Sequence, residues 1–302
     1  MDINLVRIVF IFNSLFTGLI GVLIGACEPY LPIVITRTYC YGKHAVTADQ
    51  PLVKKVEVPK RWFAHFYIFA APASTCMLLL VINRYWYNID APQFVYNILD
   101  FLLGSSRKSL VPPERTFLAA ILLTIQCWKR LYETCFVSVF SDSKINISHY
   151  IVGFVHYIGT ISSVIGESRG FVRGSAGNFH WDGISYTLRF CAAIFLWASY
   201  WQLKTNYTLV RLRKNEKGVV VTKSYKIPRG ELFDYISGPL QFTEILMYLA
   251  LSIILWPSTT YHWIFIWVLI NQTSCAFMSH RWYLQTFKNY PKERKRLIPF
   301  IL

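Results

Sequence analysis

The residues best suited to do chemistry lie in one polar stretch of the second half of the chain, residues 202–244. Its basic side chains outnumber its acids and alternate with tyrosines and glycines. The basic residues are Lys204, Arg211, Arg213, Lys214, Lys217, Lys223, Lys226 and Arg229. Lysine and arginine bind phosphate groups, and arginine also stacks on flat rings. The stretch therefore predicts a cradle for a phosphorylated ligand that carries a ring.

A second set of ionisable residues, Lys129, Arg130 and Glu133, is spaced by three or four positions inside an apolar run. On a helix these side chains share one face. Charged groups within a membrane span are costly and indicate function, with Arg130 then contacting a cofactor phosphate. The alternative is an ion pair at the membrane boundary whose charged ends reach water. The sequence favours neither interpretation strongly.

Three further candidates stand where apolar runs begin or end. His65 follows a basic turn, and its imidazole could hydrogen-bond or protonate a substrate oxygen, although a boundary histidine among interface aromatics explains it too. Glu244 could accept from a carboxamide or a ribose hydroxyl, or could only stabilise a helix N-terminus. His280 and Tyr283 share a helix face, where aromatic anchoring is the alternative to a ligand contact.

Composition indicates an integral membrane protein. Of the 302 residues, 54% are hydrophobic and 17% aromatic, which is unusual for a soluble domain of this length. The net charge of +15 comes from short loops between apolar runs, and no nucleic-acid-binding motif accompanies it. Neither metal-ligand spacing nor a hydrolase motif is present in the sequence. We expect no nucleic-acid partner, no metal and no obligate protein partner.

The apolar runs predict an all-α polytopic fold with about seven transmembrane helices. A span needs about 20 largely apolar residues. The expected spans are 5–26, 63–81, 115–140, 149–165, 186–203, 240–256 and 262–278. Residues 94–103 are too few to cross, so we expect a re-entrant or interfacial helix there.

The distribution of lysine and arginine predicts the orientation. With the C-terminal tail in the cytosol, the loops on that side hold 21 Lys and Arg residues, and those on the opposite side hold 6. Basic loops stay in the cytosol. We therefore expect a cytosolic C-terminus and a lumenal N-terminus.

Several motifs resemble the steroid 5α-reductase family. Residues 224–238 (SYKIPRGELFDYISG), the helix with Glu244 and the tail 280–302 fit its C-terminal pattern. Residues 58–68 (VPKRWFAHFYI), 129–141 and 213–221 are similar to the branch of polyprenol (polyprenal) reductases. The resemblance covers most of the chain after residue 58.

The resemblance implies a fold and an activity. We expect one integral membrane domain over 1–302, in which 1–140 contributes to a substrate cavity and 141–302 binds NADPH. The implied reaction reduces the α-isoprene double bond of a long polyprenyl lipid in dolichol synthesis, at the endoplasmic reticulum membrane. The implied cofactor contacts are Arg130, Gln202, Asn206, Arg213, Tyr225, Glu244, His280 and Tyr283.

Four positions depart from the steroid enzymes within this resemblance. Leu240 and Cys275 stand where the family has an asparagine and an arginine, so the cofactor contacts at these two positions are in question. His65 and Cys127 stand where the steroid enzymes have a glutamate and a tyrosine. A steroid ketone therefore lacks its usual pair of partners, and His65 is the expected catalytic residue.

Hydride transfer needs an electron-poor carbon, which the β-carbon of an α,β-unsaturated aldehyde provides and an allylic alcohol does not. We therefore expect polyprenal as the direct substrate, with His65 polarising its oxygen. A 3-oxo-steroid 4-ene 5α-reductase is the nearest alternative. An isoprenylcysteine-type membrane methyltransferase and a non-catalytic lipid-binding scaffold are alternatives of other classes.

Overall fold

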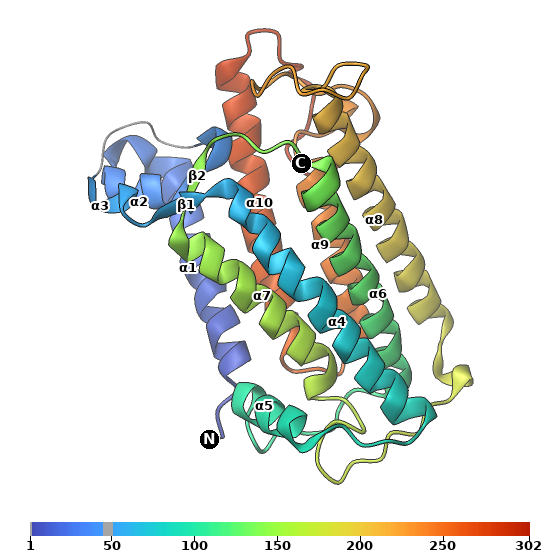
Figure 1. Ribbon diagram of the computed structural model, residues 1–302. Coiled ribbons are helices and arrows are strands. Elements are labelled where there is room, and N and C mark those ends of the chain that lie inside the picture. The colour runs from blue at the N-terminus through green and yellow to red at the C-terminus, as the bar shows by residue number, and fades with distance from the viewer. Residues whose placement is uncertain (1, 45–50) are drawn as a thin grey trace.

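The computed structural model describes residues 2–44 and 51–302, and helices dominate it. Seven long helices run roughly side by side in this part of the chain (Figure 1). They are α1 (Leu5–Cys27), α4 (Phe63–Trp86), α6 (Pro113–Tyr132), α7 (Ile147–Gly166), α8 (Tyr186–Arg211), α9 (Pro239–Ile254) and α10 (Tyr261–Thr286). Each of the seven expected spans coincides with one of them, so the helical part of the fold prediction is confirmed.

Whether all seven helices cross a membrane is a separate question. Among the described residues, two segments are long and apolar enough to span one, Leu5–Tyr30 and Lys60–Trp86. Most other long helices carry polar or charged groups that lower their hydropathy, as Lys129 and Glu133 do at the end of α6 and the start of η4. The seven-span topology therefore stays a prediction.

Four helix ends lie several residues from the expected boundaries: Trp86 of α4, Tyr132 of α6, Arg211 of α8 and Thr286 of α10. α8 continues to Arg211, so the first part of the polar stretch is helical and not a loop. Its buried Gln202 and Thr205 pack inward, and this tertiary burial outweighs the polar character of the segment. α6 ends at Tyr132, and a π-helix, η4 (Glu133–Val137), follows it.

One end of the bundle carries the N-terminus and the short helix α5 (Gln93–Leu103) (Figure 1). α5 buries Val95, Leu99 and Leu103 and exposes its other face. Asp100 on this helix forms an ion pair with Arg107 at 2.8 Å. The helix agrees with the expected short helical segment at 94–103, which cannot cross a membrane by its length.

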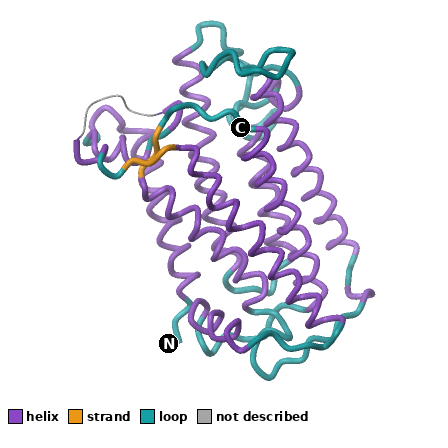
Figure 2. Tube along the Cα trace, in the orientation of Figure 1, coloured by secondary structure: helices purple, strands orange, loops and turns teal. Residues whose placement is uncertain are grey.

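The opposite end carries the C-terminus and most of the irregular segments (Figure 2). Two short strands, which the sequence did not predict, pair here in antiparallel fashion: β1 (Glu57–Pro59) and β2 (Lys144–Asn146). The remaining elements are η1 (Glu28–Tyr30), α2 (Ile33–Tyr39), η2 (Gly42–His44), α3 (Pro51–Lys54), η3 (Lys60–Trp62) and η6 (Glu231–Asp234) at this end, and η5 (Trp181–Gly183) before α8. This arrangement brings the segment before α4 against the ends of α8 and α10.

Candidate functional site

A cavity of about 390 Å³ lies at the end of the bundle where α8 and α10 terminate. Its walls come from η2, η3, α8, α9, α10 and the segments that connect them. Four basic residues line it, Lys43, Lys60, Arg213 and Lys226, and among residues 2–44 and 51–302 no aspartate or glutamate lines it. We call it the basic cavity. Four basic groups that share a cavity without a carboxylate make a site for an anion.

Lys43 is held among a neighbouring lysine and an aromatic ring. Burial, and after it the neighbouring charge of Lys60, lowers the pKa of Lys43 to about 7. Its Nζ lies 4.2 Å from the centre of the Tyr283 ring. Gly42 has a φ of +65°, and a β-carbon there would come within 2.8 Å of Lys60 Nζ. Glycine suits this position because a side chain is strained at such a positive φ and would also displace the Lys60 ammonium.

Arg213 and Tyr225 meet at the same cavity. The Arg213 guanidinium lies 5.0 Å from the centre of the Tyr225 ring, and its Nη1 donates to the backbone oxygen of Val139 at 2.6 Å. The contact to Val139 leaves other guanidinium donors available, because arginine has five. Asn206 also lines the cavity, and its buried Nδ2 has no hydrogen-bond partner within residues 2–44 and 51–302. A buried amide without a partner fits a ligand that accepts a hydrogen bond there.

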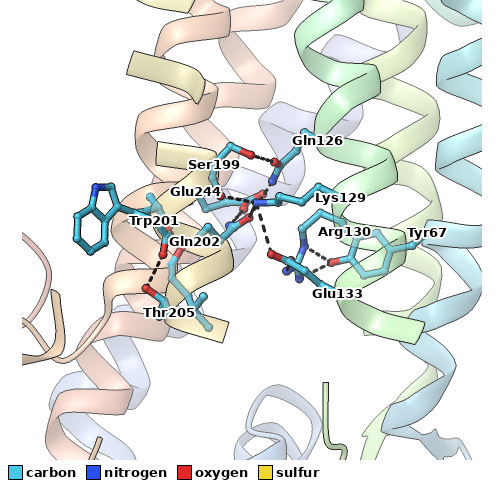
Figure 3. Close-up of polar contacts among 12 residues, drawn as sticks. Tyr67, Gln126, Lys129, Arg130, Glu133, Ser199, Trp201, Gln202, Thr205 and Glu244 are labelled. Atoms are coloured by element: carbon cyan, nitrogen blue, oxygen red, sulfur yellow. Dashed lines mark hydrogen bonds and ion pairs between the residues drawn. The ribbon is translucent and has the colours of Figure 1, made fainter. Parts of the chain in front are cut away.

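A second group of polar side chains, the inter-helix cluster, joins α6, α8 and α9 (Figure 3). Gln202 is at its centre. The Gln202 Oε1 accepts from Lys129 Nζ at 2.6 Å and from Gln126 Nε2 at 2.9 Å, and its Nε2 donates to Glu244. Ser199 completes the cluster through a 2.9 Å bond to Gln126 Oε1. The cluster places a carboxylate and two amides in the interior of the bundle.

Arg130 extends this cluster toward α4. Its Nη1 pairs with Glu133, which is fully buried, and its Nη2 donates to the Tyr67 hydroxyl at 2.9 Å (Figure 3). The three residues therefore form a buried ion pair with an attached phenol. The sequence allows two interpretations of the charged residues at 129–133. Because Glu133 is buried, it does not fit an ion pair whose charged ends reach water.

The basic cavity and the inter-helix cluster adjoin each other along α8. Gln202 and Asn206 are four residues apart, so they share a helix face with a separation of about 6 Å along the axis. Asn206 lines the basic cavity, and Gln202 belongs to the inter-helix cluster. An elongated ligand could therefore place an anionic end in the cavity and a polar ring at Glu244.

Two expected site residues lie elsewhere. His65 is exposed on α4, with its Nδ1 3.1 Å from the Tyr150 hydroxyl and its ring against Trp62. His280 faces Ser237, whose Oγ lies 2.7 Å from the His280 Nδ1, and it does not line the basic cavity. Tyr283, on the same helix as His280, does line it.

The cavity also contains residues that sequence reasoning missed. Lys43 and Lys60 belong to a loop that was noted only for its overall basic character. No motif marks them, and their approach depends on how the segment before α4 folds back. Leu240 and Cys275, the two departures from the family pattern, line the same cavity. Lys43 and Lys60 thus line the cavity together with Cys275, which stands at the position where the steroid enzymes have an arginine.

The sequence was compared with known families and curated proteins. The profile of the family described as 3-oxo-5-alpha-steroid 4-dehydrogenase matches residues 142–302. The polyprenal reductase of Drosophila melanogaster is 38% identical over 306 residues, which cover 99% of this chain and 94% of that protein. The chain belongs to this reductase family, in its polyprenal reductase branch.

Further relatives of the branch come from distant animals. The polyprenal reductase of Caenorhabditis elegans is 34% identical over 300 residues, with 95% of both chains covered. That of Homo sapiens is 30% identical over 256 residues, with 81% of this chain and 78% of that protein covered. The family profile begins after α6, so Lys43, Lys60 and Arg130 lie outside it, whereas the similarity to the Drosophila melanogaster protein covers nearly the whole chain.

Proposed function

We propose that this protein is a membrane-embedded polyprenal reductase that uses NADPH to saturate the α-isoprene double bond in dolichol synthesis. The observation that carries the proposal is that Asn206, which lines the basic cavity, and Gln202 of the inter-helix cluster lie one turn apart on α8. A dinucleotide has an anionic phosphate end and a neutral nicotinamide ring, and these two environments suit the two ends. Relatives named polyprenal reductase over nearly the full length of the chain support the substrate class.

The residues of the basic cavity fit the phosphates of NADPH. Lys43, Lys60, Arg213 and Lys226 supply positive charge, and no carboxylate in the described part of the chain lines the cavity beside them. NADPH carries one phosphate more than NADH, so this excess of cations favours NADPH. Tyr225 and Tyr283 offer flat faces for the adenine ring, and the unpartnered amide of Asn206 offers a hydrogen bond.

The inter-helix cluster fits the nicotinamide end. Glu244 is the acceptor for the carboxamide NH₂, and Gln202 holds the Glu244 carboxylate in place. Bound NADPH supplies the hydride. Lys129 and Gln126 in turn orient Gln202, so the ring would meet a preorganised set of donors and acceptors. Arg130 keeps the buried Glu133 paired and holds the Tyr67 hydroxyl.

The substrate is the aldehyde rather than the alcohol, since only the aldehyde makes the β-carbon electron-poor. His65 is the sequence-based candidate for polarising the aldehyde oxygen. The long isoprene tail would leave the bundle between helices and continue into lipid. We place the protein in the endoplasmic reticulum membrane with seven crossings, as the family resemblance implies. The C-terminus is cytosolic in this proposal, because the basic segments gather on that side.

A direct assay tests the proposal. Protein purified in detergent is incubated with NADPH and either polyprenal or polyprenol, and mass spectrometry follows the gain of two hydrogens. We expect the gain with the aldehyde and not with the alcohol. Gain with neither substrate, although NADPH binds, would contradict the proposed substrate. A protein that binds S-adenosylmethionine in place of NADPH would contradict the reductase itself.

A steroid 5α-reductase is the second candidate, because the matching family profile carries that description. His65 and Cys127 occupy the positions of the ketone-binding pair, and Cys127 is buried without an acidic neighbour in hydrogen-bond contact among the described residues. A 3-oxo-4-ene steroid is therefore the comparison substrate in the same assay, and we expect no reduction of it.

A further inference from the structure

A histidine–tyrosine pair lies in the apolar core of the bundle, beyond the inter-helix cluster. His156 on α7 places its Nε2 2.5 Å from the hydroxyl oxygen of Tyr248 on α9. Both residues are buried, with 9% and 4% of their surfaces exposed. The imidazole packs against the rings of Phe10 and Trp267, at centroid distances of 6.2 and 5.1 Å. Polar groups in such surroundings are costly unless their hydrogen bonds are complete.

The hydrogen bonds of this pair are not complete. His156 Nδ1 and Trp267 Nε1 are both buried without a partner in the part of the chain that the structure describes. If the Tyr248 hydroxyl donates to His156, the imidazole N–H at Nδ1 is left unpaired. If His156 Nε2 donates to Tyr248, the hydroxyl hydrogen of Tyr248 is free to point elsewhere. In this second arrangement the pair presents an oriented donor to a ligand.

The position of Tyr248 relates it to the proposed cofactor site. Leu240, Glu244 and Tyr248 follow one another at intervals of four residues on α9, so they share one face at steps of about 6 Å. Leu240 lines the basic cavity, and Glu244 belongs to the inter-helix cluster. Tyr248 is therefore the next side chain along the same face, one turn beyond the carboxylate assigned to the nicotinamide.

Aromatic residues on α4 and α7 pack beside this pair. The Tyr157 ring lies 5.6 Å from that of Tyr67 and 5.1 Å from that of His156. Tyr67 receives its hydrogen bonds from Arg130, which connects this group to the inter-helix cluster. Flat apolar faces suit an isoprene unit, whose conjugated double bond is planar. A hydroxyl donor among them suits an aldehyde oxygen.

We propose that Tyr248, oriented by His156, donates the hydrogen bond that polarises the aldehyde oxygen of the prenyl substrate. The proposal rests on the proposed reductase function and names the group that activates its substrate. Bound NADPH would supply the hydride for the new C–H bond at the β-carbon and would leave as NADP⁺. The electron pair of the double bond shifts toward the carbonyl carbon, and the carbonyl π electrons move to oxygen. Tyr248 stabilises this enolate oxygen, and the α-carbon then takes a proton from water as the carbonyl re-forms.

The first test replaces Tyr248 by phenylalanine, with the whole protein in detergent and a prenyl α,β-unsaturated aldehyde as substrate. We expect kcat to fall about 100-fold, as it does when one preorganised donor to an oxyanion is removed. The affinity for NADPH should stay unchanged. The matched control is Tyr85→Phe, which removes a buried hydroxyl that bonds to the Arg169 backbone oxygen at the other end of the bundle. A Y248F protein with more than half of the wild-type kcat would overturn the proposal.

His156 acts as a positioning residue, and two variants separate this role from packing. Glutamine can keep a hydrogen bond to Tyr248, whereas phenylalanine keeps only a ring. We expect H156Q to retain much more activity than H156F, with kcat and not KM for NADPH accounting for the difference. Equal kcat values for H156F and wild type would contradict the role of His156.

A measurement on the wild-type protein makes the test independent of how variants fold. A prenyl aldehyde labelled with ¹³C at the aldehyde carbon is bound together with NADP⁺, which cannot deliver hydride, and its infrared carbonyl stretch is recorded. We expect a lower frequency than for the same aldehyde in hexane, because a hydrogen bond weakens the C=O bond. An unshifted stretch would overturn the assignment of Tyr248. Absence of any reduction of this aldehyde by wild-type protein with bound NADPH would instead contradict the proposed substrate of the reductase.

Discussion

Gln202 and Glu244 are 42 positions apart in the chain, and a hydrogen bond from the Gln202 amide to the Glu244 carboxylate joins α8 to α9. Gln202 also accepts from Lys129 on α6, so a single amide connects three helices. This contact places the carboxylate at the junction between the basic cavity and the core of the bundle. The relationship makes Glu244 the first residue to test.

Replacement of Glu244 by glutamine should weaken NADPH binding by about 10- to 100-fold. A hydrogen bond to a charged group contributes about 1.5–3 kcal/mol, which corresponds to this range of affinity. Titration of the purified protein with NADPH, followed by nicotinamide fluorescence, measures the change. Glu231→Gln is the matched control, since Glu231 pairs with the partly exposed Lys204 at 3.5 Å. Equal affinities of the two variants would contradict the role of Glu244.

Lys43→Met tests the basic cavity with a side chain of similar length. We expect about a 10-fold or greater loss of NADPH affinity, because a phosphate would lose a charge-assisted hydrogen bond. The control is Lys223→Met, at an exposed lysine that pairs with Asp142 outside the cavity. Isothermal titration calorimetry gives both values. A loss of the same size with both variants would indicate a general effect of charge rather than a site.

The lowered pKa of Lys43 predicts how NADPH affinity varies with pH. Burial, and then Lys60, lowers this pKa to about 7, and a bound phosphate would raise it. Below pH 7 the lysine is already protonated, so binding needs no proton uptake. Above pH 7 binding must add a proton, so we expect Kd to rise by up to about tenfold per pH unit. Titrations between pH 6.5 and about pH 9 check this slope, and Lys43→Met should flatten it.

His65→Ala separates the two candidates for the oxygen donor. The sequence assigns this role to His65, whereas its ring lies at an exposed position beside Tyr150 and Trp62. Because the basic cavity and the inter-helix cluster do not include it, we expect the variant to keep more than half of the wild-type turnover. A kcat reduced about 100-fold at unchanged NADPH affinity would restore His65 as the catalytic residue. The rate of polyprenal reduction at saturating NADPH provides the measurement.

Much of the site follows from the motifs in the C-terminal half. Arg213 and Tyr225 were predicted to bind one ligand, and they meet at the basic cavity. Gln202 and Glu244 were predicted as cofactor contacts, and they bond to each other. Gln202, Arg213 and Glu244 lie on or directly beside α8 and α9, so helical spacing limits where they can go, whereas Tyr225 lies in the connection between these helices and was marked by its motif.

Other features depended on contacts that no local pattern describes. Lys43 and Lys60 reach the cavity only because the segment before α4 folds against α8 and α10, with β1 paired to β2. The direction in which the His65 side chain points depends on how α4 is rotated against α7. A helical period specifies which residues share a face, but packing against neighbours decides which face is buried.

The sequence by itself therefore determined the helical class, the positions of the seven long helices and the basic end of the molecule. Apolar runs and loop charges are local properties, and each acts over one helix or one connection. Tertiary structure alone decided that lysines from the N-terminal half enter the cavity and that His156 meets Tyr248, 92 residues away. Such pairings arise when helices distant in sequence pack together, because burial of their side chains depends on all the neighbouring helices at once.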